Sequence, residues 1–105
     1  MNISITISQA RPIPPGEVLV EACLEPRGIT IAELASASGL SRKHLSRIIN
    51  GHVGITAGTA VRLAGALGTT PELWLNLQNK VGLYDAQISV APETVRPLVA
   101  EAIVQ

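Results

Sequence analysis

The stretch "ASASGLSRKHLSRIING", residues 35–51, decides the fold. Its small, glycine and aliphatic residues recur with the spacing of a helix-turn-helix. Ala35 lets two helices cross closely, and Gly39 suits the left-handed position of the turn. Leu45 and Ile48 follow at helical spacing and face the core. The stretch therefore predicts two short helices joined by a turn of about three residues.

Capping residues set the predicted helix boundaries. "TIAE", residues 30–33, has the form of a capping box, so a helix begins there. Ser41 is the natural N-cap of the following helix. Proline and threonine mark three more helix starts by similar rules. The sequence thus predicts an all-α domain with five helices, over about 15–25, 30–37, 42–50, 56–67 and 70–81.

The second helix of the helix-turn-helix is a candidate DNA-reading helix. With its aliphatic side chains facing inward, its polar side chains face outward. Arginine can bind guanine through two hydrogen bonds, asparagine and lysine can reach base edges or phosphates, and a serine at a helix start suits a phosphate. A solvated surface role is the alternative for each residue, and a capping role for the histidine. The predicted DNA-binding residues are Ser41, Arg42, Lys43, His44, Ser46, Arg47 and Asn50.

The charge distribution supports that helix although the chain is formally neutral. No acidic residue lies between Glu33 and Glu72, and four basic residues fall there. The middle of the chain therefore carries +4 and the flanks −4. A local basic face can bind phosphates whatever the total charge. Four positive charges are few for salt-stable DNA binding, so a dimer that doubles them is expected.

A candidate dimer interface lies in "ELWLNLQNKV", residues 72–81. Its apolar side chains cover more than one face of the predicted helix, so one face can pack on the core and another on a partner. Helix-turn-helix proteins commonly pair to read two half-sites. The alternative is that these side chains complete a monomeric core. The predicted interface residues are Leu73, Trp74, Leu75, Leu77, Gln78 and Val81.

Composition excludes several other functions. The chain has no Phe, one Trp and one Tyr, which argues against the aromatic stacking platforms of single-strand-binding folds. The single cysteine, Cys23, allows no internal disulfide and fits no zinc motif. No catalytic, metal or cofactor site is expected, because no nucleophile motif or phosphate-binding loop is present. The start of the chain lacks a signal peptide, and no run of about 18 apolar residues could span a membrane, so a cytoplasmic protein is predicted.

The two ends of the chain fall outside the predicted domain. Residues 2–8, "NISITIS", alternate in hydrophobicity as a strand does. A lone strand needs a partner, so this arm either pairs with another chain or stays a frayed end. The C-terminal stretch "ETVRPLVAEAIV" has a weak helical pattern. We therefore divide the chain into an arm (1–10), a DNA-binding and dimerisation domain (11–86) and a helical tail (87–105).

Longer stretches of the chain resemble a known family. "RPIPPGEVLVEACLEPRGIT", and "NG" and "GIT" followed by "GTTPELWLNLQ", are similar to the HigA/VapI-type antitoxins of bacterial toxin-antitoxin modules. The resemblance covers about residues 11–86 and implies a lambda-repressor-like fold. It also implies a cytoplasmic homodimer that binds the operator of its own operon and neutralises a HigB-type toxin, an mRNA-cleaving ribonuclease. Gly58 departs from the pattern, because relatives often have an acidic residue there.

Three functions are compatible with these sequence features. The leading hypothesis is a DNA-binding antitoxin that represses its own operon. The second is a stand-alone helix-turn-helix regulator without a toxin, which the core sequence does not distinguish from the first. The third is a protein-binding module whose basic helix has no role in DNA binding.

Overall fold

The computed structural model describes residues 10–99, which form helices and no strand within that range. The all-α prediction is confirmed, and the predicted strand arm over 2–8 lies outside the described residues. The elements are α2 (Pro15–Val18), the π-helical turn η1 (Leu19–Leu24), the 3-10 turn η2 (Glu25–Arg27), α3 (Ile31–Ser38), α4 (Arg42–Ile49), α5 (Ala57–Leu67), α6 (Pro71–Ser89) and the 3-10 turn η3 (Pro92–Thr94).

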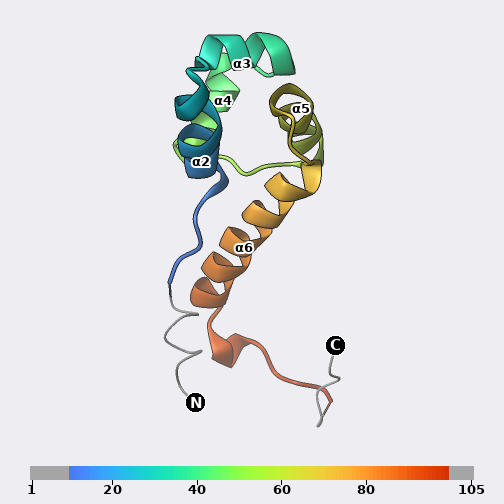
Figure 1. Cartoon of the computed structure of the whole chain (residues 1–105). Coiled ribbons are helices and arrows are strands. Elements are labelled where there is room, and N and C mark those ends of the chain that lie inside the picture. Colours follow the sequence, from blue (N-terminus) through green and yellow to red (C-terminus); the bar gives the residue numbers. More distant parts are fainter. Residues whose placement is uncertain (1–9, 100–105) are drawn as a thin grey trace.

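The helices are arranged so that α3 and α4 lie together at one end of the molecule (Figure 1). α2 and α5 flank this pair, and α6 leads away from the end of α5 toward the opposite end. The described chain is consequently elongated, with principal extents of 53 × 28 × 23 Å. The helix-turn-helix is thus exposed at one end, with the long helix pointing away from it.

The helix starts follow the capping pattern predicted from the sequence. In four helices, a side-chain oxygen accepts a hydrogen bond from the backbone amide three residues later, at 3.0–3.3 Å. These caps satisfy amides that have no partner inside the helix. The capping box is complete, because the Thr30 amide donates to Glu33 Oε1 at 2.9 Å. The capping residues are Thr30, Ser41, Thr56 and Thr70.

The first helix differs from the regular helix predicted over 15–25. After α2 the backbone widens into the π turn η1 and then tightens into η2, which ends at Gly28 with φ of 65°. A π turn bonds each residue to the fifth along the chain. This wider turn brings Leu19, Cys23 and Leu24 into the core and leaves Ala22 exposed. In a regular helix Ala22 would share the buried face with Leu19 and Cys23.

The core is built almost entirely of aliphatic side chains around one tryptophan. The five largest side chains that are completely buried come from η1, α3, α4, α5 and α6, one from each. They belong to one apolar cluster, in which α3, α4 and α5 pack around the start of α6. These five side chains are Trp74, Leu19, Leu34, Leu45 and Leu63. The inward orientation expected for Leu45 and Ile48 is confirmed, since 0% and 3% of their surfaces are exposed.

Helix α6 is longer than predicted. The pattern placed its end near Val81, with Gly82 as an interruption, but the helix continues to Ser89. Gly82 is exposed and a Cβ there would meet nothing within 4 Å, so it weakens the helix by only about 1 kcal/mol relative to alanine. α6 therefore crosses the predicted boundary between 86 and 87, and the division into arm, domain and tail remains a prediction.

The tail is less helical than predicted over the residues that the structure describes. After η3, Val95 is extended, with φ of −120° and ψ of 127°, and no helix covers 95–99. Pro97 favours this result because the residue before a proline is biased toward extended backbone. None of the described helices combines the length and apolar character that crossing a membrane requires.

Candidate nucleic-acid interface

Helix α4 presents a continuous polar surface to solvent. At about 100° per residue, the exposed side chains occupy an arc of about 140°, and the buried ones lie on the other side. Leu45 and Ile48 anchor that other side in the core. Six of the seven predicted DNA-binding residues are exposed together on this surface or at its ends: Ser41, Arg42, Lys43, Ser46, Arg47 and Asn50.

His44, the seventh predicted residue, lies differently. Its side chain is only half-exposed, and Nε2 is 3.5 Å from the hydroxyl of Thr59 on α5. Thr59 is itself buried, so His44 leans against α5 rather than away from the protein. This position follows from the helix periodicity, because His44 lies next to Ile48 on the side of α4 that faces the core. A role in packing α4 on α5 accounts for it.

The ends of α4 use their polar groups within the helix. The hydroxyl oxygen of Ser41 accepts from the His44 amide at 3.0 Å, which leaves the hydroxyl proton available to a phosphate. The side-chain nitrogen of Asn50, Nδ2, donates to the Ser46 hydroxyl at 3.4 Å, one turn earlier. These contacts fix the first and last polar side chains of the surface relative to the helix.

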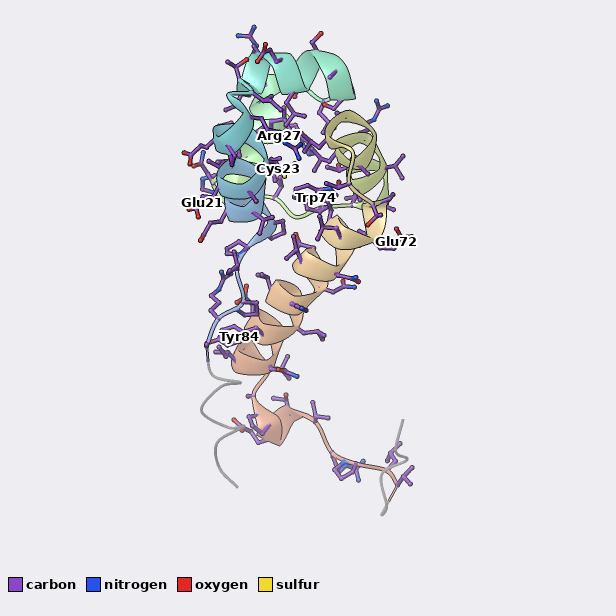
Figure 2. All side chains as sticks on the ribbon, in the orientation of Figure 1. Glu21, Cys23, Arg27, Glu72, Trp74 and Tyr84 are labelled. Carbon is purple, nitrogen blue, oxygen red and sulfur yellow. The ribbon has the colours of Figure 1, made fainter. Side chains whose placement is uncertain are left out.

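The charges on α4 and on the first helical segment have opposite signs. α4 carries Arg42, Lys43 and Arg47, and neither α4 nor α5 contains an acidic residue. The acidic residues of the first helical segment, Glu17, Glu21 and Glu25, recur at every fourth position and are exposed. Figure 2 shows Glu21 pointing away from the body, on the side opposite to Cys23 and Arg27. The polarised molecule expected from the sequence therefore has its positive charge concentrated on one helix.

The position of α4 depends on a close approach to α2. A Cβ at Gly16 would lie 2.4 Å from the Ile48 carbonyl oxygen and 2.8 Å from the Ile49 Cα. Both are backbone atoms of α4, so any side chain at position 16 would push the two helices apart. Gly16 lies within the helix predicted over 15–25, and the sequence pattern predicts no close helix contact at this position.

The predicted dimer-interface residues are divided by the structure. Trp74 is fully buried in a single chain, with Nε1 donating to the Thr69 hydroxyl at 2.8 Å (Figure 2). Val81 is only 7% exposed. The core of one chain therefore covers almost all of these two side chains, and their place at a dimer interface stays a prediction.

Gln78 has a role inside the chain that was not foreseen. Its Oε1 accepts from the Ile55 amide at 2.8 Å and thereby ties the loop between α4 and α5 to α6. Leu75 and Leu77 are half-buried against the core. Leu73 is 37% exposed, so part of its side chain is accessible to a partner.

A hollow of about 490 Å³ lies between α2, the loop 50–55 and α6. Arg11 and Asp85 at its edge form an ion pair of 3.1 Å, and both side chains are about half-exposed. His52 and Glu17 also line it, and within residues 10–99 no hydroxyl or thiol does. Among residues 10–99 there is no group of three or more histidine, cysteine or acidic side chains arranged to hold a metal ion.

Known proteins share both the sequence and this geometry. A helix-turn-helix family model matches residues 20–74. Antitoxin HigA-1 of Vibrio cholerae is 46% identical over 93 residues, which cover 87% of this chain and 88% of that protein. The chain belongs to the HigA family of helix-turn-helix antitoxins. This membership confirms the resemblance noted from the sequence.

Solved structures of HigA-type antitoxins superpose on the chain. The antitoxin GraA in complex with its operator has a TM-score of 0.76 and 39% identity, covering 87% of this chain and 95% of that one. The Pseudomonas aeruginosa antitoxin HigA with the higBA promoter has a TM-score of 0.72 and 34% identity, covering 85% and 100%. The described residues therefore have the all-α, lambda-repressor-like fold expected for a HigA-family member.

Proposed function

We propose that this HigA-family chain is a DNA-binding antitoxin that represses its own operon as a homodimer and neutralises a HigB-type, mRNA-cleaving toxin. The observation that carries the DNA-binding role is the exposed polar surface of α4, with three basic side chains and no acid. Two similar antitoxins have been solved with their operator or promoter DNA, which supports the same partner here.

In this proposal α4 enters the major groove, which is wide enough for one helix. Arg42 at the first turn and Arg47 one turn later reach base edges or phosphates, and Asn50 lies at the far end of the same surface. Ser41 directs its hydroxyl proton and the helix start toward a phosphate. Leu45 and Ile48 are buried, so they contact no base and instead hold the helix against the core.

A dimer places two such helices on successive half-sites, about 34–36 Å apart. We propose that the second chain packs against one face of α6. Leu73, Leu77 and Ile88 project from that face at helical spacing, and 37% of Leu73 and 68% of Ile88 are exposed. Replacing Ile88 with glutamate should shift the sedimenting mass toward the monomer. A dimer of unchanged mass would reject this face.

Catalysis is not part of the proposed function. Among the described residues the hollow beside α2 offers two acids and a histidine but no nucleophile, and Cys23 is buried in the core. The repressor acts on DNA in the cytoplasm, where the operon is transcribed, and needs no cofactor or metal. Its other partner is the toxin, whose binding surface on this chain we leave unassigned.

The test of DNA binding uses a triple variant of the basic surface, R42A/K43A/R47A, and a duplex carrying the region upstream of its own gene. Each phosphate contact contributes about 0.9 to the slope of log affinity against log salt. Because the homodimer carries each of the three side chains twice, the triple variant should bind more weakly and lose up to about 5.4 from that slope. The control, R96A, removes an exposed positive charge after η3, outside both α4 and the proposed dimer face, and should change neither value. Unchanged affinity and slope in the triple variant would reject the proposed interface.

The stand-alone regulator remains the second candidate function, because the core sequence does not distinguish it from an antitoxin. Expression of the chain with its neighbouring open reading frame decides between them. A toxin that co-purifies with the chain and stops inhibiting growth supports the antitoxin. Repression of the operon without any such partner supports the stand-alone regulator.

A further inference from the structure

Arg62 of α5 is the fourth basic residue of the acid-free stretch, and it does not lie on the surface of α4. Its Nη1 donates to the Ser38 carbonyl oxygen at 3.1 Å. Ser38 is the last residue of α3, where carbonyl groups lack partners within the helix and carry partial negative charge. The guanidinium of Arg62 therefore closes the C-terminal end of the helix that precedes the turn.

The same guanidinium occupies the space beside Gly39. Gly39 has φ of 77°, and a Cβ built on it would lie 2.5 Å from Arg62 Nη1. The absence of a side chain at position 39 thus has two causes, the left-handed backbone and the arginine packed against it. The Leu40 amide donates to the Ser38 hydroxyl at 3.2 Å within the same turn. Two side chains, those of Arg62 and Ser38, therefore hold the turn.

A second contact from α5 reaches α4 itself. Thr59, one turn before Arg62, is buried and lies 3.5 Å from the half-exposed His44. α5 therefore meets the helix-turn-helix at two successive points, the turn through Arg62 and the first turn of α4 through Thr59. Together these points fix both the entry to α4 and its rotation.

We propose that Arg62 is a positioning residue for operator recognition, which holds the turn so that the N-terminal side chains of α4 meet the correct base edges. The inference rests on the proposed DNA-binding function and goes beyond it, because Arg62 acts through Ser38 and Gly39 and does not touch DNA. Its chemical role requires a charged donor that reaches a carbonyl from a fixed direction, which suits the rigid fork of arginine.

The chain contains a matched control. Arg27 also donates from Nη1 to a backbone carbonyl in the last turn of a helix, that of Leu67 on α5, at 3.3 Å. Arg27 comes from η2 and touches neither the turn nor α4 in that contact. R27M and R62M therefore remove the same charge and the same type of helix-end contact, and only R62M alters the support of the reading helix.

The experiment measures the affinity of each variant for its operator duplex and for a scrambled duplex, across salt concentrations and well below the unfolding temperature. In R62M the ratio of specific to non-specific affinity should fall at least about fivefold, the size expected when one good base contact is misaligned. Its salt slope and non-specific affinity should stay as in the wild type. R62K, which keeps a donor, should recover part of the ratio, and R27M should keep all of it.

Other results would overturn the inference. A salt slope reduced by about 1.8 in R62M, from one contact in each chain of the dimer, with both affinities lowered alike, would make Arg62 a phosphate contact instead. A lower unfolding temperature with an unchanged ratio would make it a structural residue only. Amide chemical shifts give a readout without DNA: R62M, unlike R27M, should shift residues 38–43. If the wild-type chain shows no preference for its operator, the proposed function fails, and these shifts alone decide whether Arg62 holds the turn.

Discussion

Replacing Gly16 with alanine tests how the reading helix is held. The new Cβ would lie 2.4 Å from the Ile48 carbonyl oxygen, and contacts of this kind are not found below 3.0 Å. α2 and α4 would therefore have to separate by about 0.6 Å or more, against backbone atoms that cannot rotate away. Overpacking of a buried contact typically costs about 1–3 kcal/mol. The free energy of unfolding of G16A should fall by that amount.

Urea denaturation followed by circular dichroism measures this change, and G58A is the control. Gly58 lies in α5, is exposed, and a Cβ there would meet nothing within 4 Å. Glycine is less favourable than alanine in a helix by up to about 1 kcal/mol, so G58A should be more stable than the wild type. The two Gly→Ala changes should thus have opposite signs. A G16A variant as stable as G58A would refute the proposed close packing of α2 on α4.

Three further predictions concern single side chains. Q78L removes the acceptor of a part-buried loop amide and should cost about 1–3 kcal/mol in urea denaturation, whereas Q87L on the exposed surface of α6 should change stability by less than about 0.5 kcal/mol. S41A removes the N-cap of α4 and should cost about 1 kcal/mol, with S36A, exposed on α3, as an almost neutral comparison. Burial raises the pKa of the Cys23 thiol above its ordinary value of 9.0. The unfolded chain therefore loses this proton first, and stability should fall above about pH 9 more steeply in the wild type than in C23A. Equal pH profiles would contradict this last prediction.

The parts of the fold that depend on local chemistry could be predicted from the sequence. A hydroxyl before a helix and the amide three residues later are neighbours in the chain, so the caps at Thr30, Ser41, Thr56 and Thr70 needed no knowledge of the rest. The inward and outward sides of α4 followed from its periodicity for the same reason. This local information was sufficient for the fold class and for the candidate reading surface.

The sequence was insufficient where distant residues decide the outcome. Trp74 sits in an apolar stretch that fits an interface or a core, and only the packing of the other helices on it selects the core. Gln78 meets a loop 23 positions away in the chain, and Arg62 meets a turn 24 positions away. Helix α6 continues beyond Gly82, because a single glycine weakens a helix without ending it. The hydrophobic periodicity of a single segment does not predict contacts between residues that are distant in the chain.

The outer part of α6 has a consequence for local stability. From Gly82 to Ser89 every side chain except that of Tyr84 is exposed, and the Arg11 to Asp85 ion pair is a surface pair of the kind that adds about 1 kcal/mol at most. Such a segment can open without unfolding the core. Backbone amides of residues 83–89 should therefore exchange with solvent much faster than those of α4 or α5. If the second chain packs on this face, a rise in protein concentration should slow exchange there before it slows exchange in any other helix.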